Sequence, residues 1–401
     1  MNVNITLTIE QSIDEFFAPH WQDETWHQVL RLISKSIEVK FFPRIMNYLL
    51  EQKMPRENYY DEDGNLVKEG FSNLILASNC FLEVESKHEI PEVADRLISV
   101  LKHEIELSEN NDKLDNEAAL ILTLLLATIG KDRSDIFLWL KEFREVHIYT
   151  PTGQRMLGST SFVSSSVVRA VSQVWKDDPT NWSWLEERLD NGESDDVKRA
   201  AIEALAQDWQ DHPETLPLLK ENIRHNPSWS IRYSAMRALI KSFPNDSETL
   251  PLLKESLQND NGDEMKIFYL LPVVKLIAEN WHAHPDTLPW LTEKTQPNEE
   301  ISIRRAAIEA IAQGWKNEPQ MFDFLCHIAR HDPYCKQSEY DKTARRSALE
   351  AVLSNYSDRP EVLGLLRDLY TIYPSDIDDS MNEFAEEQLA NWTMQSPELE
   401  N

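Results

Sequence analysis

A block of about 34 residues recurs through the C-terminal half of the chain, and this period constrains the fold more than any other feature of the sequence. Each copy has an aromatic residue at the same place, and successive aromatics lie 34, 34, 38, 34 and 41 residues apart. A fixed period in this range is typical of a solenoid, in which each unit buries its apolar face only against its neighbours. These marker aromatics are Trp175, Trp209, Phe243, Trp281, Trp315 and Tyr356.

Two helices are predicted in each copy, joined by a short turn after the marker aromatic. Apolar residues three and four positions apart precede the aromatic, so they share one helical face. Many of them are alanine, which has high helix propensity and allows a neighbouring helix to approach closely. In the copy of Trp209 this face is Val197, Ala201, Ala204 and Leu205. For the second helix we predict N-caps at Thr215, Thr249 and Thr287, each with a proline two residues later in the first turn.

These patterns predict an all-α protein: a right-handed α-solenoid of HEAT-like two-helix repeats that follow an irregular helical N-terminal part. The motif Asp/Ser–Val/Ile–Arg/Lys–x–x–Ala–x–x–Ala–Leu/Ile–Ala resembles the first helix of HEAT repeats. With Gln-x-Trp before the turn and Thr-Leu-Pro-Leu/Trp-Leu after it, the unit resembles the C-terminal repeats of cyanobacterial NACHT-type signalling NTPases. The residues Trp21, Trp26, Val29 and Leu32 resemble the helix that opens the helical C-terminal portion of those proteins.

A stretch rich in glycine and hydroxyl residues at positions 150 to 164 is the best internal boundary. We therefore expect an irregular helical region at 1–150, HEAT-like repeats at 160–375, and a C-terminal capping helix with an acidic tail at 376–401. A kinked or distorted helix is expected at Pro272, which replaces a small helix residue.

The formal net charge of −29 excludes some partners. It opposes binding to the phosphate backbone of nucleic acid and to an anionic membrane surface. The first residues resemble no signal peptide, and we find no apolar run long enough to span a membrane. Three cysteines suit a reducing compartment, so we expect a cytoplasmic protein with a protein or peptide partner.

No motif for catalysis stands out, and we expect no enzyme, cofactor or metal. The pair Gly130-Lys131 lacks the rest of a phosphate loop and is interpreted as a helix C-cap. The segment from Cys326 through His327 and His331 to Cys335 has two histidines four residues apart, but ordinary packing explains it better than zinc. The surroundings of Cys80 are those of a helix core, where a thiol is inert.

The resemblance implies a binding solenoid, the sensor or scaffold part of a NACHT-like signalling or defence system without the NTPase domain. The alternative is a HEAT-like phycobilin lyase or lyase subunit, which absorbance with added bilin would distinguish. We expect the second helices to line the concave face and to bind the partner. The predicted partner-binding residues are Lys220, Arg224, Lys254, Lys294, Arg330, Trp182 and Trp229.

Basic residues also recur at the starts of the first helices, and two interpretations remain open. They pair with acidic residues of adjacent repeats and fix the stacking, or they form an arginine stripe that grips an acidic segment of a partner. The residues are Lys198, Arg199, Arg232, Arg304, Arg305, Arg345 and Arg346.

Overall fold

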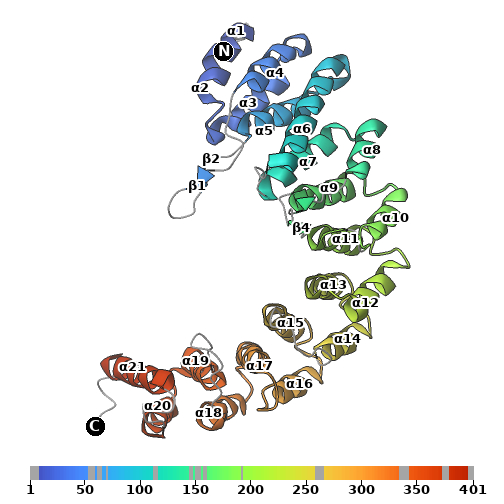
Figure 1. The fold of residues 1–401 in the computed structure, drawn as a ribbon. Coiled ribbons are helices and arrows are strands. Elements are labelled where there is room, and N and C mark those ends of the chain that lie inside the picture. The colour runs from blue at the N-terminus through green and yellow to red at the C-terminus, as the bar shows by residue number, and fades with distance from the viewer. Residues whose placement is uncertain are drawn as a thin grey trace. The chain divides into compact units, whose positions relative to one another are not determined.

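The computed structural model is an α-solenoid built almost wholly from helices (Figure 1). By its contacts the chain forms two compact units, Met1–Leu218 and Leu219–Asn401, which are described separately below. The boundary expected near residue 150 adjoins a stretch largely outside the described residues and stays a prediction. The structure describes residues 9–52, 59–60, 66–68, 71–111, 116–143, 148–149, 155–156, 160–190, 193–257, 266–333, 343–372 and 379–395.

The N-terminal part of unit 1 is an irregular set of helices with two short antiparallel strand pairs. The strands are β1 (Tyr59–Tyr60) with β2 (Leu66–Lys68), and β3 (Ile148–Tyr149) with β4 (Arg155–Met156). A π-helix (Ile13–Phe17) and two short 3-10 helices (Val39–Phe41 and Lys87–Glu89) complete it. The helices are α1 (Ile9–Ser12), α2 (Ala18–His20), α3 (Glu24–Ser36), α4 (Phe42–Glu51), α5 (Ser72–Glu83), α6 (Pro91–Asn111), α7 (Asn116–Ile129) and α8 (Ser134–Glu142).

From residue 160 onward, first and second helices alternate as the repeat predicts, and a last helix α21 (Asp379–Gln395) follows them. The first helices are α9 (Thr160–Val174), α11 (Asp195–Asp208), α13 (Trp229–Ser242), α15 (Lys266–Asn280), α17 (Ile301–Gly314) and α19 (Ala344–Tyr356). The second helices are α10 (Thr180–Glu187), α12 (Thr215–His225), α14 (Thr249–Ser256), α16 (Thr287–Lys294), α18 (Met321–His331) and α20 (Glu361–Ile372). Helix α15 continues through Pro272 without interruption.

The same backbone turn joins the two helices of every repeat. The backbone carbonyl of the marker aromatic accepts a hydrogen bond from the N–H of the third residue after it. The carbonyl of that third residue accepts a hydrogen bond from the N–H of the sixth residue after the aromatic. In the copy of Trp209 these bonds are His212 N–H to Trp209 O and Thr215 N–H to His212 O, at 3.0 and 3.1 Å. Equivalent pairs follow the other five marker aromatics. This repeated geometry fixes the angle at which each second helix leaves its turn.

The threonines predicted as N-caps have a different role. Thr249 and Thr287 are the first residues of their helices, and the N-caps are Glu248 and Asp286 without side-chain capping bonds. The hydroxyl of Thr215 instead donates backward to the carbonyl of Trp209, at 2.8 Å. Thr249 donates in the same way to Phe243 O, at 3.2 Å. These side chains are fully buried, so they satisfy the turn rather than the helix end.

The apolar face predicted for the first helices is the core. Val197, Ala201 and Leu205 are at most 1% exposed, and the corresponding residues of α17 are buried as well. Among the marker aromatics, Trp315 and Tyr356 are buried, whereas Trp209 is half-buried. Gly130 ends α7 as a C-cap, and its N–H donates to Leu126 O at 2.9 Å. A Cβ at Gly130 would lie 2.7 Å from the Ile136 side chain, so this contact requires glycine.

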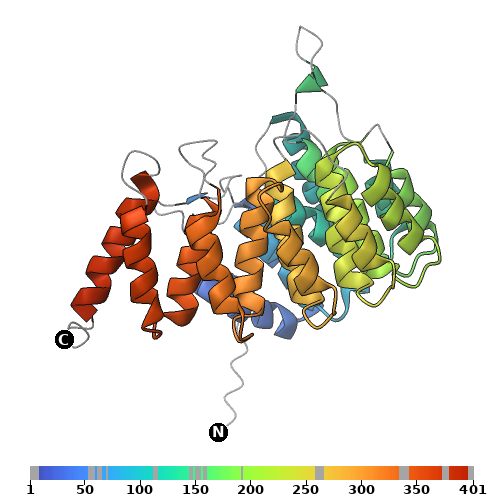
Figure 2. The same cartoon turned by 90° about the horizontal axis from the view of Figure 1, so that it is seen from below.

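Within unit 2 the first helices pack closely, each against the next. Helix α13 packs on α15, α15 on α17 and α17 on α19, whereas among successive second helices only α18 and α20 are in extended contact in the described part. Figure 1 places the first helices of this unit on the inner side of the curve, and Figure 2 shows them standing side by side with the second helices. The expectation that second helices line the concave face is therefore wrong for unit 2. Small side chains on the first helices explain this, because they let these axes approach more closely.

Replacing Thr215 by valine tests the turn. Valine has the same shape but cannot accept the hydrogen bond that the Trp182 indole N–H makes to Thr215 Oγ1 at 3.1 Å. We expect a loss of about 1–3 kcal/mol in the free energy of unfolding, the cost of one buried group left without a partner. Urea denaturation measures this loss. The control is Thr128→Val on α7, whose exposed hydroxyl bonds only to Leu124 O; equal losses in the two variants would contradict this role for Thr215.

Candidate partner-binding surface

The first helices carry a regular row of polar side chains that their own packing leaves accessible. Six and two residues before each marker aromatic, the side chains are exposed or half-buried and lie on one helical face. A third position, ten residues before the marker aromatic, is half-buried in several copies, for example at Arg199 and Tyr233. We call the first two positions the first-helix row. Its members are Arg169, Gln173, Glu203, Gln207, Arg237, Lys241, Lys275, Glu279, Glu309, Gln313, Glu350 and Ser354.

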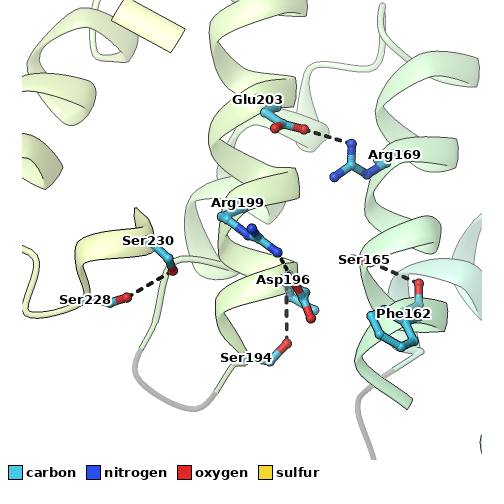
Figure 3. Close-up of polar contacts among 10 residues, drawn as sticks. Phe162, Ser165, Arg169, Ser194, Asp196, Arg199, Glu203, Ser228 and Ser230 are labelled. Atoms are coloured by element: carbon cyan, nitrogen blue, oxygen red, sulfur yellow. Dashed lines mark hydrogen bonds and ion pairs between the residues drawn. The ribbon is translucent and has the colours of Figure 1, made fainter. Parts of the chain in front are cut away.

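Ion pairs cross this row between neighbouring repeats. In unit 1 the Arg169 guanidinium lies 2.8 Å from the Glu203 carboxylate and joins α9 to α11 (Figure 3). In unit 2 the Lys275 ammonium lies 2.8 Å from the Glu309 carboxylate and joins α15 to α17. These side chains are well exposed, so each pair contributes at most about 1 kcal/mol and a partner can compete for its charges.

The basic residues at the first-helix starts are largely engaged within the protein. Arg199 pairs with Asp196 one turn earlier on α11, as Figure 3 shows. Arg304 is buried, pairs with Asp332 and donates to the carbonyl of Thr295 at 3.2 Å. Arg345 is also buried and donates to the carbonyl of Asp332. The contacts of Arg304 and Arg345 reach the preceding repeat and support the interpretation that these residues fix the stacking, whereas the Arg199 pair stays within one helix.

Two of the lysines predicted to bind a partner are buried in ion pairs. Lys220 is 8% exposed, and its ammonium lies 2.8 Å from both the Asp246 and the Glu248 carboxylates. Burial acts to lower the pKa of Lys220, but these two carboxylates raise it above its ordinary value. Lys294 is 4% exposed and lies 2.7 Å from Glu299. Both side chains are largely buried, which counts against the prediction that they line a binding face.

The remaining predicted cations differ in their surroundings. The Lys254 ammonium donates to the carbonyl of Asp286 at 3.1 Å and lies over the Trp290 ring, and burial lowers its pKa. Arg330 pairs with Asp368 on the next second helix, at 3.0 Å. Arg224 is exposed and borders a cavity of about 420 Å³ that Arg232 and Glu255 also line. Of the five cations predicted to bind a partner, only Arg224 is exposed.

Both predicted tryptophan anchors are structural. Trp182 is 8% exposed, donates to Thr215 and stacks on His212 with ring centroids 4.2 Å apart. Trp229 is 6% exposed and is covered by the guanidinium of Arg232, 3.9 Å from the ring centroid. Because a partner-binding tryptophan needs accessible area, this burial counts against the prediction that these two anchor a partner.

The two faces of unit 2 differ in charge. The first-helix row and the half-buried positions beside it carry five basic residues, Arg237, Lys241, Lys275, Arg305 and Arg346, and three acidic ones, Glu279, Glu309 and Glu350. The exposed side of the second helices and their N-caps is mainly acidic. Its acidic residues are Glu221, Glu248, Glu255, Asp286, Glu293, Asp323, Glu361 and Asp368. The sequence contains the regular spacing of this row, because its members fall at fixed offsets from the marker aromatics, but not the side of the unit on which the row lies.

Metal-ligand clusters and reactive thiols are both predicted to be absent from the chain. Among the described residues, no group of three or more His, Cys, Asp or Glu side chains is placed to hold a metal ion. Burial raises the pKa of the Cys80 thiol to about 12 and that of Cys326 to about 11, so both thiols are protonated near neutral pH. The rings of His327 and His331 lie 4.8 Å apart, whereas Cys335 lies outside the described residues.

Substitution of Lys220 distinguishes a structural role from a binding role. We expect Lys220→Met to reduce the free energy of unfolding by about 1–3 kcal/mol, because a charged hydrogen-bond donor is lost from a poorly exposed site. Arg224→Met, one turn along α12, should change it by less than about 0.5 kcal/mol. Urea denaturation of both variants provides the comparison.

The effect of Lys220→Met should also depend on pH. Burial acts to raise the pKa of Asp246, but hydrogen bonds from Lys220 and Thr249 lower it below its ordinary value of 3.8. A carboxylate with a lowered pKa stabilises the fold above its ordinary pKa, and this contribution is lost as pH falls through the lowered value. The gap between wild type and Lys220→Met should therefore narrow below about pH 4. A gap that stays constant from pH 7 to pH 3 would contradict the pairing.

Comparison with known proteins supports the repeat architecture. A family model described as HEAT repeats matches residues 182–267, which run from α10 into the start of α15. A search of curated proteins finds no match to this chain. None of the described helices is both long and apolar enough to cross a membrane. HEAT repeats in general form scaffolds that bind other proteins, and this chain contains a segment similar to them.

Proposed function

We propose that this chain is a non-enzymatic protein-binding scaffold and that a polypeptide partner binds along the first-helix row. The observation that carries this proposal is the row itself. It repeats on successive first helices, which in unit 2 lie on the inner side (Figure 1), and its residues are exposed or half-buried. Stacked repeats present such a row as an extended surface, which suits a polypeptide better than a small molecule.

The contacts of the second helices support the same choice. Lys220, Lys254 and Arg330 each reach the following repeat, where they contact acidic side chains or a backbone carbonyl. A partner that competed for these contacts would loosen the stacking of the repeats. The first-helix row carries mostly exposed ion pairs, which are exchanged for contacts to a partner at little energetic cost.

The resemblance to NACHT-type NTPases supports a finer proposal, in which this scaffold is the sensor part of a signalling or defence system. The segment that resembles the start of their helical portion contains α3, and Val29 and Leu32 on α3 are 42% and 55% exposed. An exposed apolar pair at this place suits contact with a preceding NTPase domain or with a separate NTPase chain.

Site-specific photo-cross-linking tests which face binds the partner. The photoreactive residue benzoylphenylalanine replaces Gln207 or Gln313 in the row, and Glu221 or Glu255 on the second helices; all four side chains are exposed. After irradiation in lysate of the source cells, mass spectrometry identifies the adducts. We expect one protein to be recovered from both row positions, with excess unmodified protein competing for it. Recovery from the second-helix positions alone would overturn the proposed surface.

A further inference from the structure

Two cations on α13 lie one helical turn apart on the row. Arg237 and Lys241 are both exposed, and within the described part of the chain no carboxylate is recorded in an ion pair with either of them. The Arg237 guanidinium lies 5.7 Å from the ring of Tyr233, on its own helix. The Arg237–Lys241 pair is therefore a concentrated positive charge on a protein whose formal net charge is −29.

The neighbouring repeat adds a third cation. Helix α13 packs on α15, where Lys275 occupies the position equivalent to Arg237, six residues before its marker aromatic. Lys275 is balanced by Glu309 on the next helix, and neither row position on α13 is acidic. Like charges on adjacent helices repel, and an anionic group of a partner relieves this repulsion.

A cavity of about 280 Å³ lies one repeat further along the same row, between α15 and α17. Its apolar lining comes from Ala278 and Ala310. The His282 ring forms one side and is held in place by stacking on Trp315, with centroids 4.4 Å apart, and by a 2.7 Å contact from Nε2 to Gly314 O. A Cβ at Gly314 would lie 3.2 Å from His282 Cδ2, so glycine leaves room for this ring.

The charge at the cavity differs from that on α13. Glu279 and Lys275 both border the cavity, and Lys275 is already paired with Glu309. A carboxylate entering here would meet Glu279, whereas an uncharged apolar side chain would contact the alanines and the histidine ring. The two parts of the row thus favour different side chains of the same partner.

We propose that the unit 2 part of the row binds an extended acidic polypeptide segment. Its carboxylates contact Arg237 and Lys241, and one apolar side chain enters the cavity beside His282. Packed helices lie about 8–10 Å apart and an extended chain advances about 3.3 Å per residue, so the segment crosses one repeat in roughly three residues. The apolar residue therefore lies roughly three to six positions from the carboxylates along the segment. This inference rests on the proposed protein-binding function and adds the chemical class of the partner.

Nucleic acid is also anionic, but the row suits it less well. A phosphate backbone needs a continuous run of positive charge, and in unit 2 the row places Glu279, Glu309 and Glu350 beyond α13. These carboxylates repel phosphates and tolerate the uncharged positions of a polypeptide.

Fluorescence anisotropy with a defined probe tests the inference. The probe is a labelled 15-residue peptide of Asp and Glu with leucine at every fourth position, compared with a lysine-for-acid version and with a 15-nucleotide oligo-dT. We expect the acidic peptide to bind and to weaken as salt increases. In the double variant Arg237→Glu/Lys241→Glu its affinity should fall at least about tenfold. The matched control is Arg224→Glu/Arg367→Glu, which makes the same change in net charge on exposed second-helix residues, and it should lose less than about twofold.

A second pair of variants tests the cavity. Gln313→Trp places a large side chain at the cavity, whereas Gln207→Trp makes the same change at the equivalent row position on α11, which is outside it. We expect only Gln313→Trp to weaken binding of the leucine-containing peptide, and neither to affect an otherwise identical peptide with serine for leucine. Circular dichroism checks folding, and Arg237→Gln/Lys241→Gln provides a milder variant with an intermediate loss.

Several results would overturn the inference. Equal losses in the row and control variants would show that only net charge matters, and equal or tighter binding of oligo-dT would favour nucleic acid. If the acidic peptide does not bind but the row positions still cross-link to a protein partner, the acidic-segment inference fails and the proposed function stands. If cross-links arise only from the second-helix positions, the proposed binding surface fails, and this inference fails with it.

Discussion

The close packing of one first helix on the next is the constraint on which the rest of this structure depends. In α11 and α17 most residues facing the core are alanine or a branched aliphatic, and Ala200, Ala201, Ala306 and Ala307 are fully buried. Small side chains permit a short distance between these helices. In unit 2 the second helices, with larger side chains, lie further apart, and the first helices occupy the inner side. Curvature and accessible surface in this unit follow from that difference in packing.

The wider spacing of the second helices explains why lysine side chains bridge neighbouring repeats there. Lys220 and Lys254 each lie five residues after the buried threonine of their own repeat. Each ammonium contacts the residue just before the corresponding threonine of the following repeat. The recipients are the Glu248 side chain and the Asp286 carbonyl, five residues after successive marker aromatics. A long flexible cation spans this distance where a short side chain does not. Lys220 and Lys254, which the sequence pattern suggested for partner binding, thus connect one repeat to the next.

Much of the fold was predictable from the sequence because it depends on local periodicity. The 34-residue repeat, the buried face of Val197 and Ala201, the C-cap at Gly130 and the final helix near Met381 all follow from patterns within a few turns. The face available for binding was not predictable in this way. It depends on small rotations that add up over several repeats, and no single repeat encodes their sum. The burial of Trp182 and Trp229 likewise depends on contacts with Thr215, His212 and Arg232 that the local pattern does not reveal.

We conclude that Lys220, Lys254, Lys294 and Arg330 of the second helices connect neighbouring repeats, whereas the cations of the first-helix row remain accessible. Lysine acetylation of the folded protein by acetic anhydride, followed by mass spectrometry, measures this without any partner. Side-chain exposure is 10% for Lys220 and 6% for Lys294, compared with 45% for Lys275. The account predicts that Lys241 and Lys275 react at least about tenfold faster than Lys220 and Lys294, whose modification requires local opening. Equal rates for the two pairs, or faster modification of Lys220 and Lys294, would contradict it.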